Sequence, residues 1–393
     1  MGRRVRIVLL IETSRGYGRM LLDGIADYAR TYGPWTFFQG ERSIDDPVPP
    51  RLRQWKPDGV IARILDRKQA TQIRRLGVPI VDVSGGAGFA DVPQVVPDQE
   101  SVVRAALDHL LERGYRQLAY AGLEGVWFSD ERRDLFMRHA AEAGCRCEVF
   151  QERGPWHASG LARREEETFR RDRGLIAWLR GLPKPVGLMA CNDTRAYQVL
   201  SACGECGIAV PGEIAVIGVN DDSVLCKLSD PPLSSVDPNA HRIGYEAAAL
   251  VSRLIDGKRP ARAVIRIEAA SVVARQSTDA VALADADMAA AVEYIRQHAC
   301  EGLTSDDLAV KLAISRRTLY RLFDRHLGRS PREEITRVKL ERVKDLLTTT
   351  RLPAEEIARL AGFEFTETMH RLFRQRFGQP PGSYRARRRI EPG

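Results

Sequence analysis

The chain has 393 residues, of which 44% are hydrophobic and 28% are charged. This length suggests two or three domains of about 150 residues, and the composition excludes collagen-like, disordered and disulfide-stapled mini-protein classes. No apolar run approaches the roughly 18 residues of a membrane span, and the stretch from Val5 to Ile11 is interrupted by a charge and too short for a signal-peptide core. We therefore expect a cytoplasmic protein with no membrane partner.

The positive charge is concentrated near the C-terminus. Residues 311–390 contain 20 Lys and Arg against nine Asp and Glu, whereas the rest of the chain contains 40 against 43. Such a basic block is typical of nucleic-acid binding and less often of binding to an anionic membrane, and a solvated basic surface is the alternative. The seven cysteines have no spacing that indicates disulfides or zinc, so we expect reduced thiols, no metal and no cofactor.

Residues 5–275 alternate short β-branched runs with helical patterns, which predicts βαβ units and parallel sheets. About 270 residues is long for one doubly wound sheet, so we expect an α/β region with two lobes and a cleft between them. Ligands bind beyond the carboxyl ends of strands in such sheets. The clearest strands are expected at Arg6–Ile11, Gly59–Ala62, Pro79–Val83, Gln117–Ala121, Val186–Ala190 and Ile214–Val219, with helices at Tyr17–Arg30, Gln99–Arg113, Glu131–Ala143 and Asp193–Cys206.

Residues 276–287 lack aromatic side chains and any strong period, so we expect a linker there. Residues 288–390 have only helical patterns and contain an internal repeat. The segment LYRLFDRHLGRSP (Leu319–Pro331) matches MHRLFRQRFGQPP (Met369–Pro381) at an offset of 50 residues. The pattern of each copy predicts a helix, a turn and a second helix. In the first copy, Thr304 and Asp307 form the pattern of a capping box. In the second copy, Gly362 supplies the turn.

The second helix of each copy carries polar side chains opposite its apolar face. Such a helix can enter the major groove of DNA, where Arg pairs with guanine, Glu with cytosine and Thr with the thymine methyl. A solvated surface is the alternative for any one residue, and Arg321 and Arg371, which recur in both copies, can also be structural or bind phosphate. The predicted DNA-binding residues are Arg316, Arg317, Tyr320, Arg321, Thr366, Glu367, Thr368, His370, Arg371 and Arg374; Arg325, Arg337, Lys339 and Arg385 to Arg389 are expected to hold phosphates or stay solvated.

Residues 291–389 resemble the DNA-binding domain of the AraC/XylS family. The segments LAVKLAISRRTLYRLFDRHLGRSP, RVKLERVKDLLTTTRLPAEEIARLAGF and RLFRQRFGQPPGSYR carry the resemblance. Met369 departs from the family, which usually has Phe there, but both residues are apolar. The resemblance implies two helix-turn-helix units joined by a long helix from Pro331 to about Thr348, each entering one of two successive major grooves.

Residues 5–275 resemble the effector-binding core of LacI/GalR repressors, which is similar to periplasmic sugar-binding proteins. The segments VVPDQESVVRAALDHLLERGYRQLAYAG, GLMACNDTRAYQVLSACGECGIAVPGEIAVIGVNDD and PPLSSVDPNAHRIGYEAAALVSRLIDG carry this resemblance. In this chain the sensor region precedes the AraC-type domain, and this domain order resembles that of the xylose operon regulators. The resemblance implies a sensor over 1–275, with one lobe at about 1–121 and 240–258 and the other at about 122–238 and 260–275, followed by a DNA-binding domain over 288–390.

The resemblance also implies the sites for a small sugar. It places ligand-binding groups at Asp98, Arg132, Asn192, Asp193 and Asn220; at Asn220 the family often has Asp. Asp98 and Asp193 can equally cap the helices that follow them. Sugar chemistry adds an aromatic face, for which Trp127 and Phe128 are candidates, although Trp127 can also be core, and the loop Glu12–Gly18 suggests Ser14 and Tyr17.

The family implies a transcription regulator, an activator of xylose or related pentose genes, that responds to a xylose-like sugar. Its expected partners are a double-stranded DNA operator, a second copy in a homodimer, and RNA polymerase. A regulator of the same architecture for another small molecule is one alternative. An α/β enzyme with a DNA-binding tail is another, but Ser84-Gly85-Gly86-Ala87-Gly88 lacks the Lys-Ser/Thr of a phosphate loop and no hydrolytic motif occurs. We therefore expect no catalytic residues.

Overall fold

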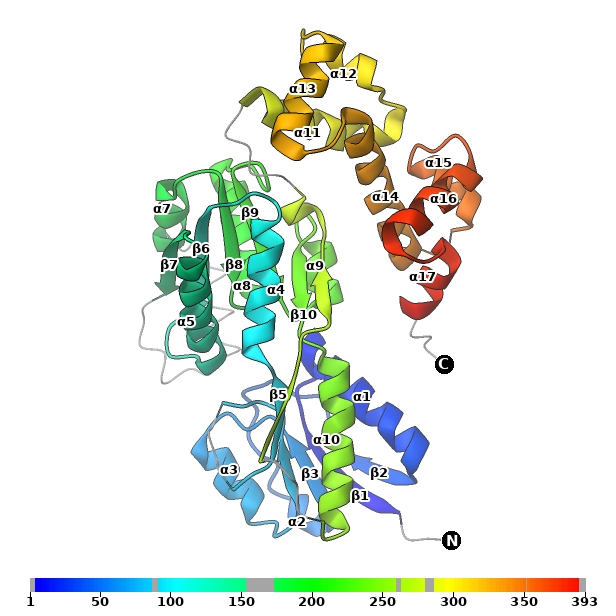
Figure 1. The fold of residues 1–393 in the computed structure, drawn as a ribbon. Helices are drawn as coiled ribbons and strands as arrows, with labels where there is room; N and C mark the ends of the chain where they lie inside the picture. The colour runs from blue at the N-terminus through cyan, green and yellow to red at the C-terminus, as the bar shows by residue number, and fades with distance from the viewer. Residues whose placement is uncertain are drawn as a thin grey trace. The chain divides into compact units, whose positions relative to one another are not determined.

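The computed structural model describes residues 4–86, 91–152, 173–258, 263–279, 286–350 and 352–388. The chain divides into two compact units, Met1–Asp279 and Ala280–Gly393, which are called here the N-terminal and C-terminal units. The N-terminal unit contains two six-stranded sheets and the C-terminal unit is helical (Figure 1). The predicted fold class, a two-lobed α/β domain followed by an all-α domain with two helix-turn-helix units, is confirmed.

The first lobe is built on a sheet with the strand order β11-β5-β4-β3-β1-β2, in which all the pairs are parallel. Its central strand β3 is apolar and buried along its whole length, which is typical of a sheet covered by helices. Its strands are β1 (Val5–Leu10), β2 (Trp35–Phe38), β3 (Gly59–Ala62), β4 (Ile80–Asp82), β5 (Gln94–Pro97) and β11 (Val264–Ile267), and its helices are α1 (Gly16–Tyr32), α2 (Leu52–Trp55), α3 (Arg67–Arg74) and α10 (Ala240–Ile255).

Helices α1 and α10 cross at very short range because a glycine stands at the contact on each side. A Cβ atom added at Gly24 would lie 1.9 Å from the carbonyl oxygen of His241, and one added at Gly244 would lie 2.0 Å from that of Leu21. Neither position accepts a larger residue without separating the helices. This contact fixes α1 against the sheet. The first turn of α1 reaches the cleft between the two lobes.

The second lobe is built on a sheet with the order β12-β10-β9-β8-β6-β7, in which only the β10–β12 pair is antiparallel. Its strands are β6 (Gln117–Leu123), β7 (Arg146–Glu152), β8 (Val186–Ala190), β9 (Ile214–Val219), β10 (Ser234–Asp237) and β12 (Ser271–Val273), and its helices are α4 (Gln99–Leu111), α5 (Trp127–Glu142), α7 (Arg173–Gly181), α8 (Asp193–Cys206), α9 (Ser223–Leu228) and η2 (Gln276–Thr278).

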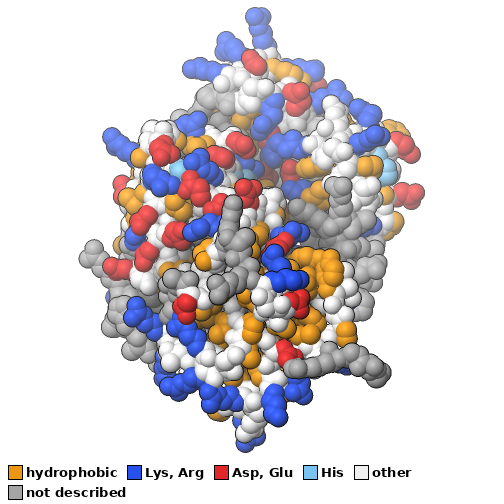
Figure 2. Space-filling model, turned by 60° about the horizontal axis from the view of Figure 1, so that its bottom comes forward, with side chains coloured by type: hydrophobic (Ala, Val, Ile, Leu, Met, Phe, Trp, Pro, Cys, Tyr) orange, Lys and Arg blue, Asp and Glu red, His pale blue; other side chains and the backbone are white. Residues whose placement is uncertain are grey.

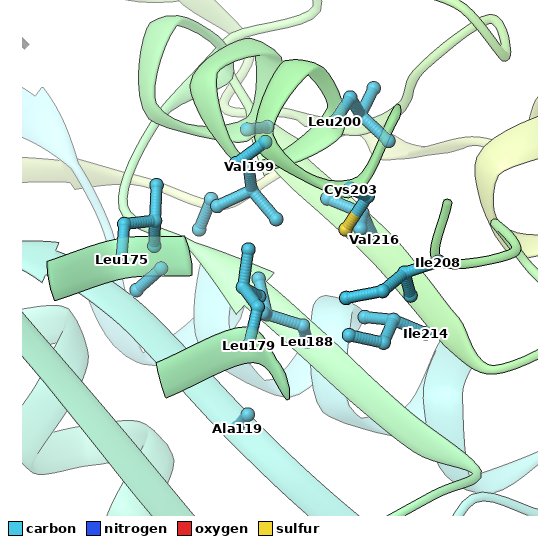
Figure 3. Close-up of a cluster of buried hydrophobic side chains, with 14 of the residues drawn as sticks. Ala119, Leu175, Leu179, Leu188, Val199, Leu200, Cys203, Ile208, Ile214 and Val216 are labelled. Atoms are coloured by element: carbon cyan, nitrogen blue, oxygen red, sulfur yellow. The ribbon is translucent and has the colours of Figure 1, made fainter. Parts of the chain in front are cut away.

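Figure 3 shows the core on one face of this second sheet. Leu179 of α7 and Val199 and Cys203 of α8 point toward strands β8 and β9, where they meet Leu188 and Val216. All these side chains are fully buried. The seven cysteines of the chain are free thiols, so apolar packing and not disulfide bonding holds this core.

The predicted lobe boundaries need correction. We expected the first lobe to continue to residue 121, but the chain leaves the first sheet after β5, so α4 and β6 belong to the second lobe. We also expected residues 260–275 to lie entirely in the second lobe, but β11 pairs with β5 in the first. Alternation of strands and helices indicates βαβ units without saying which sheet each strand joins, which explains both errors. The return of α10 to the first lobe agrees with the expected range 240–258.

The expected linker 276–287 begins too early. Ser277 and Thr278 in η2 are fully buried, and Ser277 Oγ donates a hydrogen bond to Val216 O at 2.6 Å. Thr278 Oγ1 also lies 2.7 Å from His109 Nε2. Polar residues at a chain boundary therefore dock onto the second lobe, and residues 280–285 lie outside the described part of the chain.

The C-terminal unit has two apolar cores, one for each copy of the sequence repeat. The first contains Leu308, Leu319 and Phe323, and the second contains Ile357, Met369 and Phe373. The long helix α14 contributes to both. The helices are α11 (Ala286–His298), η3 (Ala299–Glu301), α12 (Ser305–Lys311), α13 (Arg316–Leu327), α14 (Pro331–Thr349), α15 (Ala354–Leu360), α16 (Thr366–Phe377) and α17 (Pro381–Arg388).

The surface is charged but interspersed with hydrophobic side chains. Figure 2 shows basic and acidic side chains spread over one face, with orange hydrophobic side chains open to the surface among them. Among the described residues, the most exposed large hydrophobic side chains include Leu228 and Val310, at 70% and 82%. None of the helices in the described ranges combines the length and the hydropathy needed to cross a membrane.

Candidate effector pocket and DNA-binding helices

A cleft in the N-terminal unit lies at the carboxyl ends of strands from both lobes. It encloses about 460 Å³ of space, including the part open to solvent. We call this cleft the effector pocket. From the first lobe it is lined by Arg15, Tyr17, Arg63, Ser84 and Pro97, and from the second by Gln99, Trp127, Phe128, Arg132, Asn192 and Asn220.

Arg132 of α5 is held in the pocket wall by three neighbours. Its Nε donates a hydrogen bond to Gln99 Oε1 at 2.8 Å, and its Nη1 donates to the carbonyl oxygen of Cys191. The guanidinium also lies 5.3 Å from the centre of the Phe128 ring. Burial lowers the pKa of Arg132, but an arginine stays protonated in proteins. The pocket therefore contains a fixed, buried cation.

A second buried arginine, Arg63, follows β3 and pairs with the Glu12 carboxylate. Burial alone would lower the pKa of Arg63, but Glu12, Tyr17 and Asp82 together outweigh this effect and the pKa is raised. The guanidinium of Arg63 lies 5.0 Å from the centre of the Tyr17 ring. Burial raises the pKa of Tyr17 to about 12, so this hydroxyl is protonated at neutral pH and can donate a hydrogen bond.

Hydrogen bonds connect the two lobes at the edges of the pocket. The backbone N–H of Gly16, at the start of α1, donates to Asp222 Oδ2 at 2.7 Å, and Arg19 Nη2 lies 3.6 Å from Asp222 Oδ1. Trp127 Nε1 donates to the carbonyl oxygen of Ser84 at 3.3 Å. Separation of the lobes would break these contacts, and two of the residues that make them, Trp127 and Ser84, also line the pocket.

Five of the eight predicted effector-binding residues line the pocket: Tyr17, Trp127, Arg132, Asn192 and Asn220. Asn192 also caps α8, because its Oδ1 accepts a hydrogen bond from Arg195 N at 2.8 Å. Trp127 is half-buried at the pocket wall, which does not support the core alternative. Their function as sugar ligands stays a prediction.

The other three predicted residues do not line the pocket. Ser14 is exposed on the loop, and the next residue, Arg15, lines the pocket instead of it. Asp98 occupies the N-cap position of α4 without making a side-chain capping bond, and the next residue, Gln99, faces the pocket. Asp193 is buried below the surface of the pocket, where it accepts hydrogen bonds from Ser235 Oγ at 2.6 Å and from Asp222 N at 2.7 Å. Burial raises the pKa of Asp193 to about 8.

Sequence reasoning missed four polar lining residues, Arg15, Arg63, Ser84 and Gln99. A general signal could have found two of them. Arg63 directly follows β3 and Ser84 follows β4 by one residue, and the carboxyl ends of parallel strands are where ligands bind. Applying that rule to every predicted strand, instead of only to those with a family motif, would have identified both positions.

Helices α13 and α16 are the second helices of the two helix-turn-helix units. Ser315 caps α13 by accepting a hydrogen bond from Thr318 N, and the predicted capping box of Thr304 and Asp307 opens α12. The turn before α16 contains Gly362, whose φ of +72° favours glycine. Most of the predicted DNA-binding side chains are exposed, namely Arg316, Arg317, Arg321, Glu367, His370, Arg371 and Arg374, whereas Tyr320, Thr366 and Thr368 are half-buried.

Within α13, the Arg316 guanidinium lies 5.6 Å from the centre of the Tyr320 ring and 3.3 Å from Asp306 Oδ1. Three of the residues expected to hold phosphates have structural partners instead. Arg337 pairs with the buried Glu334, Lys339 Nζ donates to Gly362 O at 2.8 Å, and an Arg385 nitrogen donates to the carbonyl oxygen of Leu352 at 2.7 Å. Their long side chains close the core edges, which sequence alone does not distinguish from a solvated surface.

Comparisons with known proteins match the whole architecture. Residues 6–101 match the family described as the XylR N-terminal domain, 107–278 a periplasmic binding protein-like domain, and 308–387 a helix-turn-helix domain. The xylose operon regulatory protein of Escherichia coli is 31% identical over 98% of this chain and 97% of its own, and that of Haemophilus influenzae is 29% identical over 97% and 98%.

Solved structures give the same result. A structure described as the xylose-binding transcription activator XylR matches 98% of both chains with a TM-score of 0.70 and 30% identity. The transcription regulator CcpA of Lactococcus lactis matches 70% of this chain with a TM-score of 0.56, but at 20% identity it shows only the shared fold of the N-terminal unit. The chain belongs to the XylR family of transcription regulators, in which a periplasmic-binding-protein-like sensor precedes an AraC-type DNA-binding domain.

Proposed function

We propose that this protein is a sugar-responsive transcription regulator whose effector occupies the pocket between the two lobes. The observation that carries the proposal is the presence, in one chain, of a polar and aromatic pocket at converging strand ends and of two helices that expose arginines from helix-turn-helix units. Hydroxyl groups would bond to Tyr17, Asn192 and Asn220, and Trp127 or Phe128 would cover the C–H face of the ring. As in the relatives, regulation and not catalysis is the function.

The effector would act on the groups that join the lobes. A ligand between Arg132 in the second lobe and Tyr17 in the first adds bonds across the cleft beside the Asp222–Gly16 and Trp127–Ser84 contacts. This favours the closed arrangement by the differential affinity of the ligand for the two states. We propose that a homodimer in the cytoplasm converts closure into a changed spacing of the DNA-binding units, and that it activates transcription through RNA polymerase.

The test has two arms, both with the full chain. In the first, selection from a random DNA pool identifies an operator, and fluorescence anisotropy measures its affinity against a scrambled duplex at several salt concentrations. We expect binding of the operator to be at least about 1,000-fold tighter than that of the scrambled duplex. Equal affinity for both sequences would overturn the DNA-binding function.

In the second arm, a panel of sugars is added to the operator complex. Xylose, the sugar in the names of the E. coli and H. influenzae relatives, is the reference compound, and arabinose, ribose, lyxose, glucose, galactose and their acids complete the panel. We expect one compound to change the operator affinity by about 5- to 150-fold. If no sugar or sugar derivative changes it, the sensor function is wrong even if the operator is bound.

A further inference from the structure

The charged side chains that line the effector pocket are all of one sign. Three of its lining residues, Arg15, Arg63 and Arg132, are cationic, and no Asp or Glu lines it among the described residues. The resemblance to LacI/GalR sensors predicted ligand-binding carboxylates at Asp98 and Asp193, and neither of them lines the pocket. Asn220 stands where that family often has Asp, and Asp98 lies outside the lining.

The nearby carboxylates are already used. Glu12, which lines a neighbouring small pocket, pairs with Arg63. Asp82 accepts hydrogen bonds from Ser84 Oγ at 2.7 Å and from Gln94 Nε2 at 2.9 Å, and Asp222 accepts from Gly16 N. Arg63 therefore has a carboxylate partner, whereas none of these carboxylates pairs with Arg132 among the described residues.

Arg132 is the clearest case. Its side chain is only 4% exposed, and both of its hydrogen-bond acceptors, Gln99 Oε1 and the carbonyl oxygen of Cys191, are neutral. Its Nη2 makes no hydrogen bond within the described residues, and it has no ion pair there. By contrast, Arg63, whose side chain is 10% exposed, has Glu12 as its partner. A buried charge is costly unless it is paired, and an arginine fork binds carboxylate or phosphate oxygens with two parallel hydrogen bonds.

We propose that the effector of this regulator is a monosaccharide-sized sugar carrying one anionic group, a carboxylate or a phosphate, and not a neutral pentose. This inference rests on the proposed function, because it assumes that the pocket holds the effector. The anion lies against Arg132 Nη2 and the neighbouring cationic wall. The hydroxyl groups bond to Tyr17, Asn192 and Asn220, whose hydroxyl and amide groups suit neutral partners.

The direct test is isothermal titration calorimetry of the full chain with matched neutral and anionic sugars at constant ionic strength. The pairs are xylose and xylonate, glucose and glucuronate, galactose and galacturonate, and ribose and ribose 5-phosphate. We expect at least one anion to bind about tenfold or more tightly than its neutral partner. Preference within a carboxylate pair identifies the anion as a carboxylate, and preference only in the ribose pair identifies it as a phosphate.

Two results would overturn the proposal. One is a neutral sugar that binds as tightly as its anionic partner or more tightly, and the other is the absence of binding by every anion up to roughly 10 mM. The operator assay separates these failures from failure of the proposed function. If a neutral sugar changes operator affinity and its acid does not, the regulator function stands and the anionic effector is wrong.

A variant of the pocket tests the electrostatic cause. Asn220→Asp keeps the shape of the side chain and adds the missing carboxylate, so we expect the affinity for the anionic sugar to fall by about tenfold or more while that for its neutral partner rises. Ser14→Asp is the matched control, because it adds the same charge on an exposed residue of the adjacent loop that does not line the pocket. We expect it to change either affinity by no more than about twofold. Equal effects of the two variants would contradict the proposal.

Discussion

The two helix-turn-helix units differ in chemistry at the junction where the chain passes from the second helix into the following helix. Glu334 and Tyr384 occupy equivalent places, three residues after Pro331 and Pro381 and 50 residues apart in the repeat. Glu334 is fully buried and accepts hydrogen bonds from Arg329 Nε at 2.5 Å and from Arg337 Nη2 at 2.8 Å. Tyr384 instead packs its ring 5.4 Å from that of Phe373 and 5.9 Å from that of Phe377.

The apolar interior does not differ in this way. Phe323 and Phe373 are both fully buried at equivalent positions, as are Leu319 and Met369. The repeat therefore keeps the side chains that hold each pair of helices together and changes the group that joins the pair to the next helix. An ionic junction depends on all its partners being present, whereas an aromatic junction depends on shape and ring contact.

The largest effect is expected from Glu334→Ala. Removing this carboxylate leaves Arg337 and the more exposed Arg329 without their buried partner, so we expect the local free energy of unfolding to fall by about 3 kcal/mol. Amide hydrogen exchange of α13 and α14 in the full chain measures the loss. Arg332→Ala, at an exposed position of the same helix, is the control and should leave exchange unchanged. Unaltered protection in Glu334→Ala would show that the ionic junction contributes nothing.

Tyr384→Leu should weaken the aromatic junction by about 2 kcal/mol. Leucine keeps an apolar side chain but loses two ring contacts of about 1 kcal/mol each. Exchange should increase in α16 and α17 and not in α13, because the two apolar cores are separate. Ser383→Ala, which changes an exposed neighbour, serves as the control. Faster exchange in α13 as well would mean that α14 couples the two units.

These two positions also show what the sequence could predict. The repeat of Leu319 and Phe323 in Met369 and Phe373 predicted both helix-turn-helix units, because apolar residues at helical spacing carry a local signal. A glutamate or a tyrosine in a helix is usually at the surface. The burial of Glu334 depends on Arg329 and Arg337 closing around it, and no local pattern encodes that arrangement.

The residues in and around the effector pocket also divide into those that a sequence pattern predicts and those that depend on distant partners. Arg132, Asn192 and Asn220 were predicted because they stand in motifs beside recognisable strands. The end of β3 could have indicated the position of Arg63, but its orientation depends on Glu12, 51 residues earlier, which holds it beside Tyr17. Asp193 was misplaced because a residue at a strand end can point into the cleft or below it. Its partners Ser235 and Asp222 lie on β10 and after β9, so only the folded second lobe decides between the two orientations.

The equivalent arginines Arg321 and Arg371 test whether both units engage DNA alike. Both are exposed on the second helix of their unit. If each binds a phosphate, Arg321→Ala and Arg371→Ala should each weaken operator binding by about tenfold, lower the salt slope by about one, and leave the sequence preference unchanged. Anisotropy titrations at several salt concentrations measure all three effects. Arg104→Ala removes an exposed charge from α4 and is the control. A loss at one position alone would show that the units bind unequally.

The smallest effects concern the helix starts, where the two units again differ. Ser315 caps α13 with its side chain, whereas Phe365 occupies the same position before α16, makes no capping bond and is 58% exposed. Ser315→Ala should destabilise the first unit by about 1 kcal/mol, and Phe365→Ser should stabilise the second by about 0.5 kcal/mol. Hydrogen exchange measures both changes, and operator titration of Phe365→Ser supplies the decisive comparison. A more stable α16 with weaker operator binding would mean that the exposed ring of Phe365 contacts DNA, whereas unchanged binding would limit the difference between the units to helix capping.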